Sequence, residues 1–318
     1  MLLKDFISSA RESLLSLYQY EEAKAIVSRL CEELLGTASY AHILDPSLEI
    51  AEDRLPELMS ALDRLASGEP LQYVLGYAWF CGRKFKVTPD VLIPRPETEQ
   101  LCSMLADAAG RGPRIQCDTA FPGREGGLKI LDLCTGSGCI AWTLACGIPG
   151  SAVQGVDISL KALSVASSQD ISLPEGCRRP SFAQYDVLEG ADGFPVLDAP
   201  ADHSKCTGVD RIADDGRFDI IVSNPPYVRE SERRSMHMNV LDFEPGLALF
   251  VPDSDPLLFY RAVADFAGKR LRKGGLGAVE INEAFGEAVA GIFSENGLTD
   301  VCTVEDFRAK TRFVTFRK

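Results

Sequence analysis

Residues 1–70 carry apolar side chains at helical spacing. Ile26, Leu30 and Leu34 repeat every fourth position, and a second apolar stripe runs one position further along the chain. Residues 55–65 form another apolar face of the same period. This spacing predicts a small N-terminal bundle of roughly four helices.

The pattern changes after residue 70. Residues 73–88 are rich in aromatic and β-branched side chains, with turn signals at Gly76 and Gly82. Such a run is typical of a β-hairpin. We therefore expect residues 71–94 to be a hairpin linker between two domains.

Strand and helix signals alternate through residues 95–318, which predicts an α/β domain with a mostly parallel sheet covered on both faces. The expected strands are residues 128–133, 152–157, 181–187, 218–223, 276–281, 300–304 and 311–316. The expected helices are residues 98–109, 138–147, 159–170, 255–272 and 284–296. Two stretches rich in Gly, Pro and Asp interrupt the rhythm and are interpreted as surface insertions, 110–126 and 189–216.

Composition and charge exclude several classes of protein. The 318 residues include 33 Lys and Arg against 46 Asp and Glu, a net charge of −13, which argues against binding nucleic acid through a basic face. We expect no membrane span and no secretory signal, and hence a cytoplasmic protein. The ten cysteines contain no C-x-x-C pair and the three histidines lie far apart, so we expect reduced thiols and no metal site.

A Gly-rich turn follows the strand predicted at 128–133. Gly136-x-Gly138-x-x-Ala141 fits the turn that lets a ligand approach the backbone, and Asp157 ends the next strand, where a carboxylate can bind both ribose hydroxyls. This pattern predicts a ribose-bearing cofactor, either NAD or S-adenosylmethionine. Asp132 favours the second, because an acid beside the glycines suits a sulfonium and an amino group but not a pyrophosphate.

The third predicted strand ends near Asp186, which can reach an adenine edge while Val187 packs on the ring; Asp186 can equally be a plain strand-end cap. The candidate cofactor-binding residues are Asp132, Cys134, Thr135, Gly136, Ser137, Gly138, Asp157, Ile158, Asp186, Val187 and Asn224.

The segment Asn224-Pro-Pro-Tyr227 follows the buried strand predicted at 218–223. Pro225 and Pro226 have no N–H and a fixed φ, so this corner is rigid and offers only acceptors. The Asn224 side-chain oxygen and the Pro225 carbonyl can accept both hydrogens of a planar substrate NH₂, and Tyr227 can cover its flat face. These four residues are the candidate catalytic and substrate-binding group, together with Arg95 and Glu97 from the stiff Pro94–Glu97 segment, which we expect beside the pocket.

Several segments resemble the release-factor glutamine methyltransferase family (PrmC/HemK) of class I methyltransferases. They are Asp132–Gly138, Asn224–Tyr227, Gly68–Gly76, Val91–Glu99, Phe243–Leu249, Asp255–Tyr260 and Val279–Asn282. The resemblance implies a Rossmann-like fold with a seven-stranded sheet and S-adenosylmethionine as methyl donor. It implies methylation of N5 of the Gln in the Gly-Gly-Gln loop of peptide chain release factors. Cys134 departs from the family, which usually has Gly there.

Alternatives remain at this stage. A glutamine methyltransferase of a ribosomal protein would share Asn-Pro-Pro-Tyr. An adenine-N6 DNA methyltransferase is a second alternative, since adenine also presents an NH₂ on a flat ring, but it must flip a base and grip phosphates. An NAD-dependent oxidoreductase leaves the Asn224 corner unexplained, and the intact Asp157 and Asn224 argue against a binding module with a relict cofactor pocket. We expect release factors as partners, without nucleic acid or membrane, a monomeric protein, and an N-terminal domain that helps to recognise the substrate.

Overall fold

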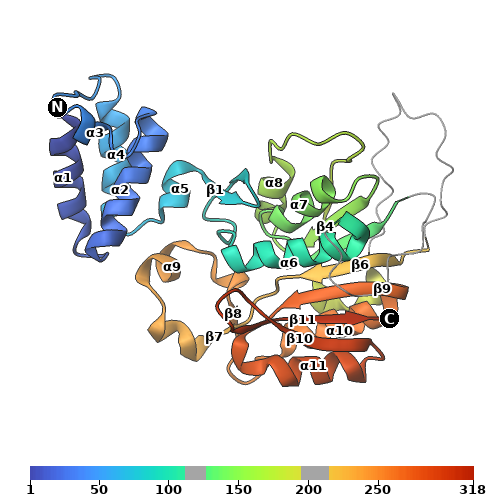
Figure 1. Ribbon diagram of the computed structural model, residues 1–318. Helices are drawn as coiled ribbons and strands as arrows, with labels where there is room; N and C mark the ends of the chain where they lie inside the picture. Colours follow the sequence, from blue (N-terminus) through green and yellow to red (C-terminus); the bar gives the residue numbers. More distant parts are fainter. Residues whose placement is uncertain (112–126, 195–214) are drawn as a thin grey trace. The chain divides into compact units, whose positions relative to one another are not determined.

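The computed structural model describes residues 1–111, 127–194 and 215–318 (Figure 1). The chain divides into two compact units. The helical unit comprises residues 1–77 together with 236–244, and the sheet unit comprises 78–235 and 245–318. In the described part of the chain, no helix combines the length and the apolar character that crossing a membrane requires. Much of the two predicted insertions lies outside the described residues.

The helical unit confirms the predicted N-terminal bundle. Residues of the predicted apolar stripes lie in its core, where Val27, Leu30 and Cys31 are all almost fully buried. A short helix from much later in the chain belongs to the same unit, which the sequence pattern did not indicate. The helices are α1 (Leu3–Leu14), α2 (Tyr20–Leu35), α3 (Ala41–Leu44), α4 (Leu55–Ala66), α5 (Leu71–Leu75) and α9 (Met238–Phe243).

The predicted hairpin is real but shorter than expected. Its strands are β1 (Tyr77–Phe80) and β2 (Arg83–Lys86). The turn residues Cys81 and Gly82 both have positive φ, at 48° and 72°, as a two-residue hairpin turn of the I′ type requires. Extending the hairpin back to Tyr73 was wrong. Tyr73 lies in α5, which ends because Gly76 adopts a left-handed φ of 78° as its C-cap.

The sheet unit contains a seven-stranded sheet in the order β10-β11-β9-β6-β3-β4-β5, and only β11 runs against its neighbours. This confirms the predicted mostly parallel α/β sheet. The strands are β3 (Lys129–Leu133), β4 (Ala152–Asp157), β5 (Ser181–Gln184), β6 (Phe218–Ser223), β9 (Leu271–Glu280), β10 (Thr299–Glu305) and β11 (Thr311–Arg317).

Helices cover both faces of this sheet, as Figure 1 shows. Alternate strand residues point to opposite cores: Leu131 and Ile221 pack under α10 and α11, whereas Ile130 and Ile220 pack under α6 and α7. The hairpin adds Phe80 to the second core. The helices of the unit are α6 (Pro96–Ala106), α7 (Cys139–Gly147), α8 (Leu160–Ser167), α10 (Leu258–Arg270) and α11 (Gly286–Glu295).

Several predicted boundaries were wrong, and three of them have identifiable reasons. The third strand ends at Gln184, since the next residues turn into a short 3₁₀ helix at Val187–Glu189. β9 begins at Leu271 rather than 276, because its pairing with β6 continues across a register shift despite the turn-like Gly274. The first helix of the unit is followed by a single wide turn at Asp107–Arg111, where Gly110 has a φ of 101°.

The segment between Tyr227 and α10 contains further elements that the pattern did not predict. These are β7 (Val228–Arg229), paired with β8 (Phe250–Val251), and 3₁₀ turns at Glu230–Ser235 and Gly246–Ala248.

Candidate active site

The centre of the sheet brings the predicted motifs together. The strand order leads from β3 through β4 to β5 on one side and from β3 through β6 to β9 on the other. Ligands of open α/β sheets bind at such a reversal, beyond the carboxyl ends of the strands. Leu133 pairs with both Val156 and Ser223. The Gly-rich loop, Asp157 and Asn224 therefore leave the sheet side by side.

The Gly-rich loop is a tight turn between β3 and α7. Gly136 and Gly138 have left-handed φ angles of 53° and 79°, and Cys134 has one of 59°. A side chain in this conformation is strained by roughly 1–2 kcal/mol. The departure at Cys134 thus falls where the backbone favours glycine. A Cβ on Gly136 would meet no protein atom within 4 Å, so this position opens onto free space.

Gly138 has a different task from Gly136. A Cβ there would lie 3.0 Å from Ala166 Cβ, 3.1 Å from Phe182 and 3.2 Å from Trp142. Gly138 is also absent from the residues that line the cavity described below. Its small size therefore serves the packing of α7 against the sheet and α8.

Asp157 ties the two strand ends together. Its Oδ2 accepts a hydrogen bond of 2.9 Å from the Gly136 amide, and its Oδ1 accepts one of 2.9 Å from Ser159. Burial raises the pKa of this carboxyl, although backbone hydrogen bonds act against the rise. Each carboxylate oxygen keeps a further lone pair. The side chain can accept two more hydrogens, as the hydroxyls of a ribose would offer.

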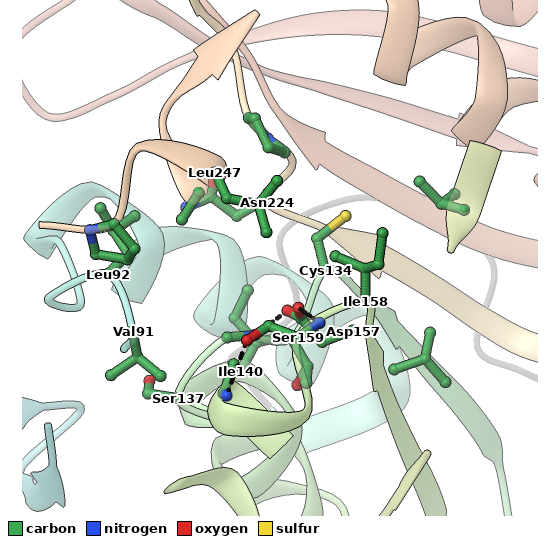
Figure 2. Close-up of a pocket in the computed structure, with 18 of the residues that line it drawn as sticks. Val91, Leu92, Cys134, Ser137, Ile140, Asp157, Ile158, Ser159, Asn224 and Leu247 are labelled. Carbon is green, nitrogen blue, oxygen red and sulfur yellow. Dashed lines mark hydrogen bonds between the residues drawn. The ribbon is translucent and has the colours of Figure 1, made fainter. Parts of the chain in front are cut away.

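A cavity lies over these strand ends (Figure 2), with about 200 Å³ open to the centres of water molecules. Asp157 and Asn224 both face it. From the predicted cofactor residues it gathers Cys134, Thr135, Gly136, Ser137, Asp157, Ile158, Asp186, Val187 and Asn224, and from the predicted substrate residues Arg95 and Pro226.

Asp186 has the predicted role of a strand-end cap, and its contact with an adenine edge stays a prediction. Its Oδ1 caps the short 3₁₀ helix by accepting a hydrogen bond of 2.9 Å from Leu188, and the residue also lines the cavity. Val187 is buried beside it, while Ile158 and Leu188 remain partly exposed at the same rim. Apolar side chains around one carboxylate suit a flat ring with a polar edge.

Asp132 lies beneath the Gly-rich loop rather than in the cavity. It is fully buried, and its Oδ2 accepts hydrogen bonds from Thr135 Oγ1 at 2.6 Å and from the Ala141 amide at 3.2 Å. Its Oδ1 has no partner in the described structure. Burial raises the pKa of Asp132 to about 7. The side chain braces the loop from below, and a direct contact with a bound cation stays a prediction.

The Asn224 corner has the rigid form that the prolines predict. Pro225 and Pro226 are buried, and Asn224 Nδ2 donates a hydrogen bond of 3.2 Å to Thr98 Oγ1. No residue in the described part of the chain donates a hydrogen bond to Asn224 Oδ1, and Asn224 lines the cavity. Tyr227 lies outside the lining, with its hydroxyl held by Glu280 at 3.0 Å.

The residues of the Pro94–Glu97 segment do not all lie at the cavity. Pro94 and Arg95 line the cavity, as expected. Glu97 does not line it and pairs instead with Arg308 at 3.6 Å. The direction changes because α6 begins at Pro96 and turns successive side chains to different sides.

Two residues near the corner were missed by the sequence analysis. Thr98 and Glu280 hold Asn224 and Tyr227 through hydrogen bonds between residues 126, 182 and 53 positions apart. Both lie in segments that carry the family resemblance, but neither has a spacing that indicates a role.

The sheet order, the Gly-rich loop, the acid at the end of β4 and the Asn-Pro-Pro-Tyr corner together define a class I methyltransferase. The residues fit S-adenosylmethionine, since Gly136 leaves the cavity floor open and Asp157 keeps acceptor capacity for a ribose. The residues that line the described cavity can be explained without a group of phosphate-binding side chains.

Comparisons with known proteins identify the family. Residues 6–76 match the family described as the PrmC N-terminal domain. The chain is 37% identical over 305 residues to the release factor glutamine methyltransferase of Bacteroides thetaiotaomicron, covering 96% of both chains. It is 31% identical over 314 residues to the enzyme of that name from Flavobacterium psychrophilum, covering 99% of this chain and 98% of the relative.

A solved structure described as a release factor-specific protein-(glutamine-N5) methyltransferase from Alicyclobacillus acidocaldarius is 25% identical. The match covers 74% of this chain and 99% of that chain, with a TM-score of 0.39. The full-length sequence relatives decide the assignment. The chain belongs to the release factor glutamine methyltransferase family.

Proposed function

We propose that the protein transfers a methyl group from S-adenosylmethionine to the side-chain nitrogen of the Gln in the Gly-Gly-Gln loop of peptide chain release factors. The observation that carries this proposal is the Asn224 corner. Asn224 lines the cavity, and its Nδ2 is engaged by Thr98, so that bond leaves its Oδ1 available to a ligand. An acceptor is thus presented where a substrate amide can enter beside the cofactor residues.

The reaction needs such acceptors because an amide nitrogen is a poor nucleophile. Its lone pair is delocalised into the carbonyl group, and it becomes available only as the nitrogen turns pyramidal. Asn224 Oδ1 and the Pro225 carbonyl, each accepting one N–H of the substrate, stabilise that geometry in the transition state. The rigid corner also aligns the nitrogen for in-line attack.

When bound, S-adenosylmethionine supplies a methyl group on a positively charged sulfur. The new N–C bond forms as the S–C bond breaks, and the nitrogen then loses one proton to water, so N5-methylglutamine and S-adenosylhomocysteine remain. In this proposal Asp157 binds the ribose, Asp186 and Val187 flank the adenine, and Thr135 and Gly136 approach the methionine part. The apolar side chains of Ile158 and Leu188 at the rim favour binding of the adenine ring there.

We further propose that the helical unit contributes to recognition of the release factor, because a single Gln side chain offers few contacts. This unit has its own core, and residues 1–70 carry thirteen acidic against six basic side chains. A short Gly-Gly-Gln peptide should then show a higher KM than the whole release factor. Equal KM values for the two substrates would contradict this role. Action in the cytoplasm follows from a substrate that works in translation, and a monomeric state stays a prediction from the sequence.

The test offers the purified enzyme and labelled S-adenosylmethionine to three substrates: a release factor, a mixture of ribosomal proteins and adenine-containing DNA. We expect label in the release factor alone, mapped by mass spectrometry to the Gln of Gly-Gly-Gln. A release factor with that Gln changed to Ala is the matched control and should stay unlabelled. Label in ribosomal protein or DNA, but not in the release factor, would overturn the proposal.

A further inference from the structure

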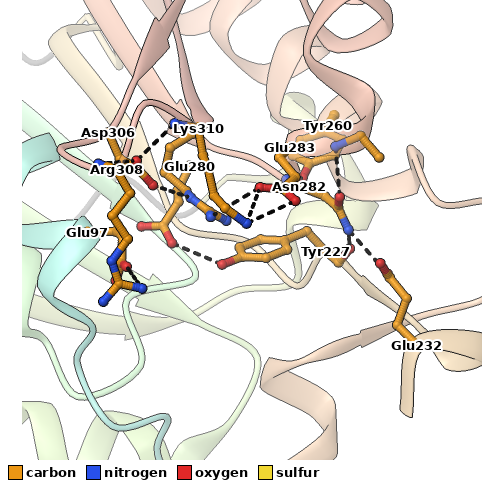
Figure 3. A network of polar contacts seen from close by, with 12 residues as sticks. Glu97, Tyr227, Glu232, Tyr260, Glu280, Asn282, Glu283, Asp306, Arg308 and Lys310 are labelled. Atoms are coloured by element: carbon orange, nitrogen blue, oxygen red, sulfur yellow. Dashed lines mark hydrogen bonds and ion pairs between the residues drawn. The ribbon is translucent and has the colours of Figure 1, made fainter. Parts of the chain in front are cut away.

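Glu280 is a buried carboxylate that holds two side chains of the candidate site. It is 1% exposed and ends β9. Its Oε1 accepts a hydrogen bond of 3.0 Å from the Tyr227 hydroxyl, as Figure 3 shows, and its Oε2 accepts one of 2.7 Å from the Thr98 hydroxyl. In its ionised form this carboxylate has no hydrogen to donate, and both hydroxyl protons then point at Glu280.

This arrangement fixes the direction of the next hydrogen bond. The Thr98 hydroxyl has one proton, which it gives to Glu280, so its oxygen can only accept from Asn224. The Asn224 amide must therefore place Nδ2 on Thr98, as it does at 3.2 Å. Its Oδ1 is left for the cavity. With the opposite direction, Asn224 would present its own N–H groups to a substrate NH₂, and two donors would face each other.

We propose that Glu280 is a positioning residue, which acts through Thr98 to keep the carbonyl oxygen of Asn224 turned toward the substrate amide. This inference rests on the proposed function and adds to it a cause for the orientation of Asn224. Glu280 is not among the residues that line the described cavity, and in this proposal it acts through Thr98 rather than by touching the substrate.

The charges around Glu280 bear on its ionised form. Arg312 on β11 favours the carboxylate, whereas Glu97 on α6 opposes it. Arg312 is itself fixed by Asp306, whose Oδ2 accepts a hydrogen bond of 3.2 Å from its Nε. Burial raises the pKa of Glu280, and the hydrogen bonds from Thr98 and Tyr227 act against that rise.

Replacing Glu280 by Gln tests the direction of the chain of hydrogen bonds. The side chain keeps its size, but its NH₂ can donate to Thr98, whose proton is then free to bond Asn224 Oδ1. We expect kcat for methyl transfer to a release factor to fall about 10- to 100-fold, with KM within about threefold. The affinity for S-adenosylhomocysteine should stay unchanged. Glu287→Gln, an exposed position on α11, is the matched control and should leave all three values unchanged.

Variants of Thr98 separate positioning from packing. Thr98→Val keeps the shape and removes the hydroxyl, and it should lower kcat by a similar factor, whereas Thr98→Ser should retain most of the activity. The double variant Glu280→Gln with Thr98→Val should be no slower than Thr98→Val alone, because both changes break one chain. If Glu280→Gln fails to bind S-adenosylhomocysteine and so has not folded, the comparison of Thr98→Val with Thr98→Ser still tests the proposal.

The inference is overturned if Glu280→Gln folds and keeps the wild-type kcat. It is also overturned if Thr98→Ser is as slow as Thr98→Val, or if the two losses multiply in the double variant. Absence of transfer by the wild-type enzyme would overturn the proposed function and this inference with it. Transfer by the wild type together with an unimpaired Glu280→Gln variant would overturn this inference alone.

Discussion

The backbone N–H of Gly136 donates a hydrogen bond of 2.9 Å to Oδ2 of Asp157, 21 positions further along the chain. The bond joins the Gly-rich loop after β3 to the end of β4. It places a carboxylate and a backbone that lacks a side chain at one wall of the cavity. The two features proposed to bind the cofactor are thus positioned by each other.

Asp157→Asn should weaken cofactor binding more than it slows transfer. The amide keeps one acceptor oxygen but replaces the other by a donor, so it cannot accept from Gly136 and Ser159 and from two ribose hydroxyls at once. We expect the Kd for S-adenosylmethionine to rise about 10- to 100-fold, measured by calorimetry. The exposed Asp170→Asn, with the same chemical change, should bind normally. Unchanged affinity of Asp157→Asn would contradict the ribose assignment.

The two glycines of the loop should fail in different ways when changed to Ala. Gly138→Ala combines a left-handed φ with three contacts of 3.0–3.2 Å, and should lower the free energy of unfolding by about 2–3 kcal/mol. Gly136→Ala meets no protein atom and should cost only about 1 kcal/mol. Its methyl group enters the cavity, however, and should reduce affinity for S-adenosylhomocysteine at least about tenfold. Denaturant unfolding and calorimetry measure the two effects; the reverse ranking would refute these roles.

Asp132 should make the stability of the ligand-free protein depend on pH. Its pKa is about 7 in the folded protein, because burial disfavours the charged form, and has the ordinary value of 3.8 in the unfolded chain. Between these values the folded state binds a proton that the unfolded state has lost. The contribution of Asp132 to stability is therefore complete below about pH 4 and is lost as the pH rises to about 7.

The comparison of wild type with Asp132→Asn isolates this effect. The variant cannot titrate there, so its stability relative to the wild type should rise with pH over that window, by up to about 1.4 kcal/mol per pH unit. Any pH-independent cost of the new amide does not affect this test, because only the change of the stability difference with pH is used. Denaturant unfolding at several pH values measures that change. Parallel curves for the two proteins would contradict a raised pKa at Asp132.

Local patterns in the sequence were enough for the sheet and much of the cavity. The strands ending at Asp157 and at Ser223 have the predicted bounds, and the second is the largely apolar run typical of a buried parallel strand. Asp186 showed why one residue can support two interpretations, since it both caps a turn and lines the cavity.

Contacts between distant segments could not be predicted in this way. The bond from Thr98 to Glu280 joins residues 182 positions apart, and neither segment has a period that reveals its partner. The same limit explains α9, which joins the helical unit from beyond β6. The misassigned Tyr73 failed for a local reason: aromatic and β-branched residues favour strands, but the helix before Gly76 overrides that preference.

The central claim is that Asn224 presents its oxygen to the amide that is methylated. The most direct measurement is the rate at which Asn224→Ala transfers labelled methyl groups to a release factor, together with its Kd for S-adenosylhomocysteine. We expect transfer to be at least about 100-fold slower with a Kd within about threefold of the wild type, because the corner acts in the transition state and not in cofactor binding. Transfer within a few-fold of the wild-type rate would contradict the claim.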